Sequence, residues 1–173
     1  MRAQAFWKAI SMDRSDLLEH FVEVLRELGV RFCVVGGQGV NAYVEPLVSL
    51  DLDLAVASGE LERLEPRLRR DFVVERFPHS LNVSQPGSDL RIQVQTDPRY
   101  AAFVDRASTQ QVLNVTLPVA TVEDVLQGKI RAATDESRRP SERQKDLADI
   151  ARLIEKYPEL RARVPDEILA KLV

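Results

Sequence analysis

The chain has 173 residues, of which 45% are hydrophobic and 29% charged, a balance typical of one soluble globular domain with a short helical extension at most. Its net charge of −3 excludes a strong overall attraction to nucleic acid. A cytoplasmic location without a membrane partner is expected, because no apolar run approaches the ~20 residues that cross a bilayer, the first eight residues lack the apolar stretch of a secretory signal, and the single cysteine, Cys33, excludes an internal disulfide.

The first part of the chain predicts a helix, a strand and a second, short helix. Residues 11–28 carry apolar side chains at helical spacing, and Gly29 is typical of the position just beyond a helix end. Residues 31–35 form a short apolar run rich in strand-forming residues. A short helix through residues 40–42 follows and is broken at Pro46.

Alternation of apolar and polar residues, strict from residue 50 to residue 54, predicts a half-buried strand over 50–56. Side chains two residues apart in a strand share a face, so Asp51 and Asp53 lie side by side on the polar face. The apolar face of this predicted strand consists of Leu50, Leu52 and Leu54.

The rest of the chain predicts strands in the middle and helices at the end. The middle is predicted to form a helix over 60–70, strands over 72–77, 80–84 and 89–96, a helix over 98–107 and a strand over 111–115. Helices over 121–133 and 142–156 follow, then a short helical tail. This order predicts an α+β fold, with a mixed sheet and helices packed on one of its faces.

The Asp51 and Asp53 pair is a candidate metal site. Two adjacent carboxylates repel each other unless a cation compensates them. Hard carboxylate oxygens suit Mg²⁺ or Mn²⁺. The alternative interpretation is a solvent-exposed strand face that merely carries two charges, although aspartate is a poor strand former.

Gly36 and Gly37 form a candidate phosphate site, because they come directly after a predicted strand and before a predicted helix. Backbone without side chains approaches a phosphate closely, and a helix amino terminus supplies free N–H donors. Glycine pairs also end many strands without binding anything. Together with the carboxylate pair, however, they describe a triphosphate cradle beside a metal ion, as used in nucleotidyl and phosphoryl transfer.

Four segments resemble the nucleotidyltransferase superfamily, and in particular its small bacterial branch of AbiEii-type toxins and minimal nucleotidyltransferases. The signature lies in residues 34–37 (VVGG) and 49–56 (SLDLDLAV). Residues 119–129 (VATVEDVLQGK) resemble a helix of that branch that carries a lysine, and residues 143–150 (RQKDLADI) resemble a later helix. The resemblance spans roughly residues 30 to 155.

The resemblance implies roles for the residues that match these motifs. Asp51 and Asp53 would be catalytic and would bind Mg²⁺ (or Mn²⁺) together with the phosphates of a nucleoside triphosphate (NTP). Gly36 and Gly37 would contact the triphosphate. Lys129 has two interpretations, a contact to phosphate and a salt bridge to Asp146 that joins two helices.

The same resemblance implies a nucleotidyltransferase-type mixed sheet with helices packed on it. Residues 1–118 would form the α/β core. Residues 119–173 would form a helical segment packed on that core, within a single compact domain.

The sequence departs from the family pattern at two positions. Leu47 stands where the family commonly has an arginine, four residues before the first aspartate of the pair. Gln93 stands where the family has a third carboxylate, and an amide cannot accept a proton as a general base. Asp89 and Asp97 are candidate substitutes, but each lies four residues away, roughly 13 Å along a strand, and Asp97 is better placed to start a turn or cap a helix.

The remaining polar groups predict no second site. His20 is expected on the first helix and His79 in a loop, and neither is spaced with Cys33 like a set of metal ligands. The arginines within 63–70 and 138–143 are interpreted as solvated helix faces or loops, with a local nucleic-acid contact as the alternative.

Three functions follow as hypotheses. The first is Mg²⁺-dependent transfer of a nucleotidyl group from an NTP to a hydroxyl on RNA, protein or a small molecule, in a toxin–antitoxin or phage-defence setting with an antitoxin partner. The second is a binding or regulatory module that has lost turnover, which Gln93 and Leu47 favour. The third is modification of an aminoglycoside-like drug, for which an acidic cleft would be expected.

Overall fold

The computed structural model describes residues 16–57 and 59–172. A helix over residues 16–27 opens this part, so the predicted start of that helix at residue 11 lies outside the described residues. Gly29 follows with a positive φ of 64°, the left-handed conformation expected just beyond a helix.

A seven-stranded mixed sheet forms the centre of the fold, in the order β3-β4-β5-β2-β1-β7-β6. Strand β1 pairs with β2 antiparallel and with β7 parallel, and β2 pairs with β5 parallel. The remaining neighbours are antiparallel. The strands are β1 (Phe32–Val35), β2 (Asp51–Val56), β3 (Val73–Phe77), β4 (Ser80–Ser84), β5 (Arg91–Gln95), β6 (Ser108–Val112) and β7 (Val115–Val119). The predicted α+β class with a mixed sheet is confirmed.

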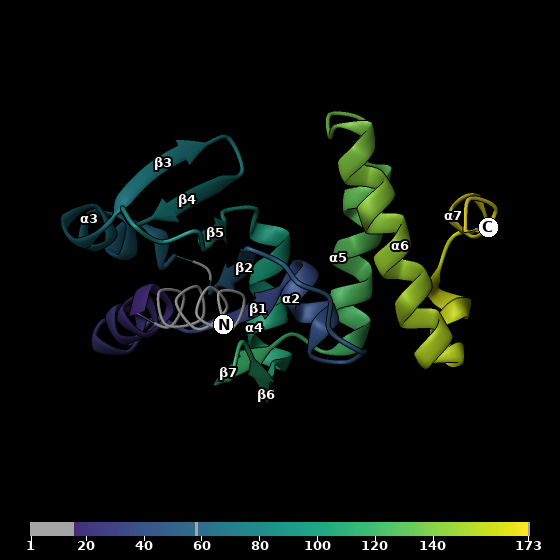
Figure 1. Cartoon of the computed structure of the whole chain (residues 1–173), viewed down its shortest axis with the longest axis horizontal. Helices are drawn as coiled ribbons and strands as arrows, with labels where there is room; N and C mark the ends of the chain where they lie inside the picture. The colour runs from purple at the N-terminus through teal and green to yellow at the C-terminus, as the bar shows by residue number, and fades with distance from the viewer. Residues whose placement is uncertain (1–15, 58, 173) are drawn as a thin grey trace, which may run out of the picture.

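The helices lie at both ends of the long axis of the molecule and across its middle (Figure 1). They are α2 (Gly36–Asn41), α3 (Leu61–Asp71), the 3-10 helix η1 (Pro98–Tyr100), α4 (Ala101–Arg106), α5 (Val122–Thr134), α6 (Pro140–Lys156), the 3-10 helix η2 (Pro158–Arg163) and α7 (Asp166–Leu169). Helix α5 begins where Thr121 caps it, accepting a hydrogen bond from the backbone N–H of Asp124 at 3.2 Å. No described helix is both long and apolar enough to cross a membrane.

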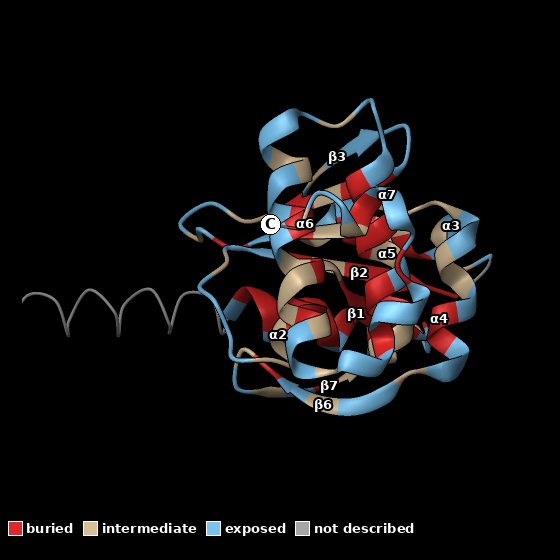
Figure 2. Cartoon of the chain, turned by 90° about the vertical axis from the view of Figure 1, so that its right-hand side faces the viewer, coloured by how far each residue is buried: buried red, intermediate tan, exposed pale blue. Residues whose placement is uncertain are grey.

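Helices cover both faces of the sheet, so the expectation of one covered face is wrong. All four residues of β1 are buried, with Val34 in one apolar cluster and Cys33 in the other. The first cluster lies under the helix over 16–27 and α3. The second lies under α2, α4, α5 and α6, whose buried residues face inward (Figure 2). A central strand that is apolar throughout requires cover on both sides, because its side chains alternate between the faces.

Two details of the strands also differ from expectation. The predicted strand over 111–115 is wrong, because β6 and β7 form a hairpin whose turn residues, Leu113 and Asn114, both have positive φ. Two such residues in succession are typical of a tight hairpin turn, but leucine in the first position hid this signal. Leu50 precedes β2 and is 37% exposed, whereas Leu52 and Leu54 are buried as expected.

Within residues 119–172, side chains of α5, α6 and α7 share a core with the sheet. Val125 of α5 packs against α2, where a methyl group added to Gly39 would lie 3.1 Å from it. Ile150 of α6 and Ile168 of α7 belong to the same buried cluster as strand β1. The division of the chain at residue 118 stays a prediction.

Candidate active site

Strand β2 carries both aspartates at the middle of the sheet. Asp53 lies opposite Val35 of β1 on one side and Gln93 of β5 on the other. Asp51 lies two residues earlier on the same strand, opposite Arg91, and its Oδ1 is 2.9 Å from Arg91 Nε. This ion pair is largely exposed, so it contributes little to stability.

The position of Gly36 requires glycine, because its backbone lies against the carboxylate of Asp53. Its φ is +65°, and a Cβ added there would lie 2.2 Å from Oδ2 of Asp53. Only glycine therefore fits between the end of β1 and this carboxylate. Gly36 and Gly37 are the first two residues of α2 rather than residues before it, so their amides belong to the amino terminus of the helix.

Gly37 faces open space. A Cβ added at Gly37 would meet no atom within 4 Å. The residue before the helix, Val35, provides no side-chain cap. The backbone amides at this helix end are therefore accessible to a phosphate beside Asp53.

Asp53 is an electrostatically unusual carboxylate. Burial raises its pKa from 3.8 to about 6; Lys129 and Arg138 oppose this shift, whereas Asp51 adds to it. No described residue donates a hydrogen bond to its side chain or forms an ion pair with it. A divalent cation would compensate this charge. A carboxylate on a solvated strand face would need no such compensation.

The raised pKa of Asp53 predicts a pH-dependent stability of the metal-free protein. The pKa of Asp53 is higher in the folded state than in the unfolded state. Its contribution to the free energy of unfolding is therefore full below pH 4 and is lost as the pH rises through 6. In urea unfolding, we expect the free energy of unfolding of wild type to fall by roughly 3 kcal/mol relative to Asp53→Asn between pH 4 and pH 7. Parallel pH curves for the two proteins would contradict this.

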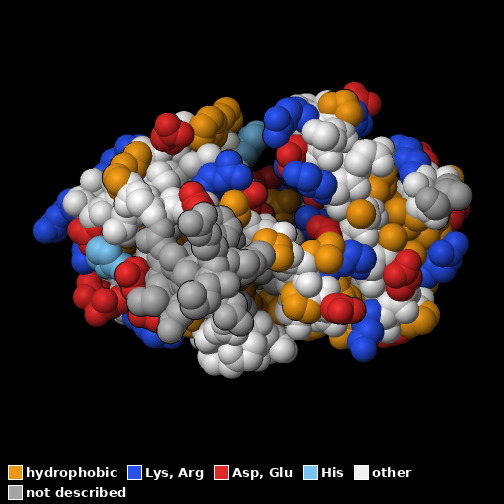
Figure 3. All heavy atoms as spheres, viewed as in Figure 1, with side chains coloured by type: hydrophobic (Ala, Val, Ile, Leu, Met, Phe, Trp, Pro, Cys, Tyr) orange, Lys and Arg blue, Asp and Glu red, His pale blue; other side chains and the backbone are white. Residues whose placement is uncertain are grey.

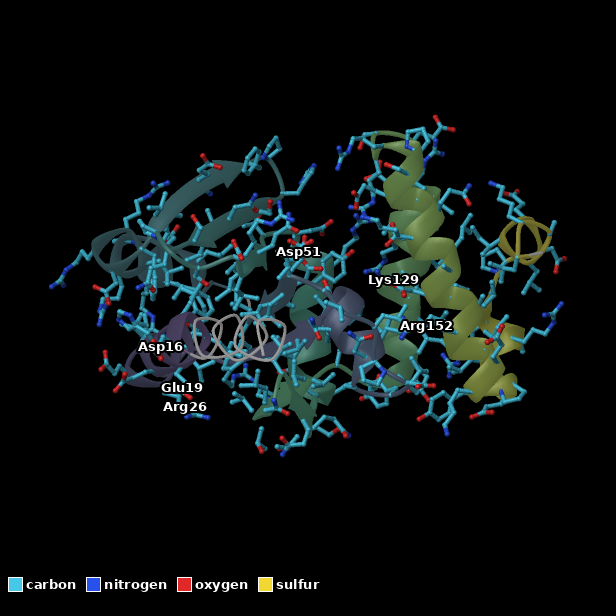
Figure 4. The ribbon with its side chains drawn as sticks, viewed as in Figure 1. Asp16, Glu19, Arg26, Asp51, Lys129 and Arg152 are labelled. Atoms are coloured by element: carbon cyan, nitrogen blue, oxygen red, sulfur yellow. The ribbon has the colours of Figure 1, made fainter. Side chains whose placement is uncertain are left out.

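Lys129 joins α5 to α6. Its Nζ lies 3.0 Å from Oδ1 of Asp146 and 2.8 Å from Oδ2 of Asp149, and all three side chains are largely buried. The structure therefore contains the predicted salt bridge to Asp146. Lys129 also lines the same cleft as Asp51, from the opposite side (Figure 4), so a phosphate contact stays a prediction.

Removing Lys129 is expected to loosen this helix pair. In Lys129→Gln the buried Asp146 retains Arg138, at 3.0 Å, and Asp149 retains Arg152, at 2.8 Å. We expect a loss of about 2 kcal/mol in the free energy of unfolding, below the cost of leaving a buried charge wholly unpaired.

Urea unfolding measures the loss in Lys129→Gln. The control is Lys145→Gln, because Lys145 is 74% exposed and its partner Glu142 lies 3.6 Å away. We expect the control to change little. Equal stability of the two variants would contradict the structural role of Lys129.

A cleft of about 890 Å³ separates the sheet from α5 and α6, and it contains all the residues predicted for the site. Both basic and acidic side chains surround this hollow (Figure 3). Leu47 stands at its rim and is 60% exposed. Within the described residues, no group of three or more His, Cys, Asp or Glu side chains is arranged to hold a metal ion. A metal here would take the two carboxylates and complete its coordination with phosphate and water oxygens.

The third-carboxylate position is neutral in the structure as well. Gln93 lies beside Asp53 and donates a hydrogen bond from Nε2 to Oγ of Ser80, at 3.0 Å. Asp97 lines the cleft but caps η1 and pairs with Arg99, at 2.6 Å. Asp89 is not among the residues that line the cleft. Neither substitute is therefore free to act beside Asp53.

The histidines occupy different places. His79 lines the cleft from the turn between β3 and β4. His20 lies away from it and contacts Asp71 at 3.1 Å.

Sequence reasoning missed three arginines of the cleft: Arg99, which pairs with Asp97, and two on the helices. Arg131 is on α5, two residues after Lys129, but on the side that faces η1. Arg152 of α6 pairs with Asp149 and donates to the backbone oxygen of Glu45, which ties α6 to the loop after α2. Nothing in the local sequence distinguishes these arginines from those on solvated helix faces.

Comparison with solved structures identifies the fold. It is similar to that of the antibiotic-resistance factor ANT(2'')-Ia, with a TM-score of 0.56 and 12% identity over 86% of this chain and 91% of that one. It is similar to the lincosamide antibiotic adenylyltransferase LnuA, with a TM-score of 0.53 and 12% identity over 79% and 95%. An antigenic nucleotidyltransferase-like protein from Paracoccidioides brasiliensis gives a TM-score of 0.50 and 16% identity over 86% and 74%. A comparison with curated proteins gave no match.

The fold is thus that of the nucleotidyltransferases. This confirms the fold that the resemblance of residues 34–37 and 49–56 implied. Residues 13–173 match the model of the family described as nucleotidyl transferase AbiEii toxin, type IV TA system. The chain belongs to this AbiEii nucleotidyltransferase family.

Proposed function

We propose that the chain transfers a nucleotidyl group from an NTP to a hydroxyl acceptor, with Mg²⁺ or Mn²⁺ as cofactor. The observation that carries this proposal is the contact between Asp53 and Gly36. A half-buried carboxylate without a partner lies against the first turn of α2, and the open backbone of Gly37 follows directly. Carboxylate oxygens next to exposed amides suit a metal–triphosphate complex.

The residues present fit such a metal ion. Asp51 and Asp53 offer hard oxygen ligands on one strand face, and Mg²⁺ commonly takes one or two carboxylates with phosphate oxygens and water. When bound, the metal would neutralise charge on the phosphates of the NTP and help to orient them. The amides of Gly36 and Gly37 bind the outer phosphates, and Lys129, held by Asp146 and Asp149, lines the opposite side of the cleft.

The acceptor would be a hydroxyl on RNA, protein or a small molecule, and the family suggests a toxin role with an antitoxin partner. A cytoplasmic location fits this proposal, because Cys33 is a buried free thiol. The second candidate function is a nucleotide-binding module without turnover. Gln93 favours it, because its amide cannot take the proton that a hydroxyl loses on attack.

Calorimetric titration of each NTP, with and without Mg²⁺, tests the binding step that both functions share. Saturable binding to at least one NTP only in the presence of the metal is expected. The released products of incubation with that NTP and candidate acceptors then separate the two functions, since only a transferase forms pyrophosphate. Absence of binding under both conditions would exclude both.

A further inference from the structure

Most of the charged side chains that line the cleft have a partner among the described residues. Nearly every cleft carboxylate in the described part of the chain has a cationic or hydrogen-bonding partner. These pairs are Asp51 with Arg91, Asp97 with Arg99, Asp124 with Arg106, Asp135 with Ser137, Glu142 with Arg139, Asp146 with Lys129 and Arg138, and Asp149 with Lys129 and Arg152. Two of the described cleft residues lack such a partner. Within the described part of the chain, Asp53 has neither a cation nor a hydrogen-bond donor at its carboxylate, and Arg131 has no carboxylate at its guanidinium.

Arg131 is held in place without an acidic partner. Its guanidinium carbon lies 5.6 Å from the ring centroid of Tyr100 and 5.7 Å from that of Phe103. Its Nη1 is buried and makes no hydrogen bond with any described residue. A buried donor atom without an acceptor is costly, so an anionic ligand that supplies the acceptor would be favoured there.

Arg131 lies on the β5 side of Asp53. The sheet order β5-β2-β1 puts Asp53 between Gly36, at the end of β1, and the segment that follows β5. Tyr100 belongs to that segment, and a Cβ added to Gly128, one helical turn before Arg131, would lie 3.5 Å from its ring. With the triphosphate at Gly36 and Gly37, the β5 side remains for the group that attacks.

We propose that Arg131 binds a phosphate group carried by the acceptor and so selects phosphate-bearing acceptors over neutral or polycationic ones. This inference rests on the proposed function, which puts the NTP at the other side of Asp53. It also differs from the drug-modification hypothesis, in which the cleft would take a polycation rather than a phosphate-bearing acceptor. The planar guanidinium suits a phosphate through two parallel hydrogen bonds.

Calorimetry with matched probes tests this assignment. The full chain is saturated with Mg²⁺ and a non-hydrolysable NTP analogue and titrated with ribose 5-phosphate, with ribose and with tobramycin, a polycation. We expect ribose 5-phosphate alone to bind, and Arg131→Gln to weaken it by at least about tenfold. The control is Arg26→Gln, because Arg26 is exposed on the helix over 16–27, far from Lys129 in Figure 4. It should change the affinity by less than about twofold.

The other outcomes overturn the inference. The inference is wrong if ribose 5-phosphate binds wild type and Arg131→Gln equally well. It is also wrong if ribose or tobramycin binds more tightly than ribose 5-phosphate, or if no probe binds. If Arg131→Gln weakens the NTP analogue by the same factor, the arginine contacts the triphosphate instead. If the analogue does not bind wild type at all, the proposed function fails, and titration of ribose 5-phosphate into the metal-free protein decides the role of Arg131 separately.

Discussion

Replacing Asp53 with asparagine is expected to weaken metal-dependent NTP binding by roughly a hundredfold. The substitution keeps the shape of the side chain beside Gly36 but removes the unpaired charge that compensates a divalent cation. Loss of this ligand is expected to cost about 3 kcal/mol, which is roughly a hundredfold in affinity. Calorimetric titration of Mg²⁺–NTP into both proteins measures the difference.

A matched control separates this effect from the loss of one negative charge. Asp16 is exposed on the helix over 16–27, far from Asp51 in Figure 4, so Asp16→Asn should bind like wild type. Because Asp53→Asn removes a buried charge, its metal-free form should be folded and, at pH 7, more stable than wild type. Unchanged metal-dependent affinity in folded Asp53→Asn would remove this residue from the site.

Gly36→Ala is expected to destabilise the protein strongly and to disrupt the site. The new methyl group would lie 2.2 Å from Oδ2 of Asp53 and would sit on a backbone with φ of +65°. Conformational strain and overpacking each cost about 1–3 kcal/mol, so we expect a total of roughly 3 kcal/mol and a fall in Tm of about 10 °C. Thermal unfolding without metal measures this change.

Two other glycines provide the controls for Gly36→Ala. Gly29 has a similar φ of +64° but open space around it, so Gly29→Ala measures the strain without the collision. Gly37 has neither a positive φ nor a close neighbour, so Gly37→Ala should leave the stability nearly unchanged while hindering the approach of a phosphate. A Gly36→Ala variant no less stable than Gly29→Ala would show that Asp53 does not lie against this backbone.

Local periodicity explains which parts of the fold were predictable. The alternation over 50–56 predicted strand β2 and put Asp51 and Asp53 on one face, because strand parity is independent of tertiary context. The hairpin of β6 and β7 was missed, because Leu113 adopts a backbone conformation that its side chain disfavours. Cover on both sheet faces was missed because it depends on how distant helices return to β1.

The site was predictable only where chemistry follows local sequence. Gly36, Gly37, Asp51 and Asp53 are adjacent to recognisable strands, and the structure brings all four to one cleft. The environment of Arg131 depends instead on Tyr100, thirty-one positions earlier in the chain. No periodicity relates such residues, so their pairing needed the three-dimensional structure.

The most direct test of the central claim is a crystal structure of the chain with Mg²⁺ and a non-hydrolysable NTP analogue. We predict a metal ion at about 2.1 Å from oxygens of both Asp51 and Asp53, with the triphosphate against the amides of Gly36 and Gly37. A nucleotide bound outside the cleft, or a metal ion held without Asp53, would contradict the account.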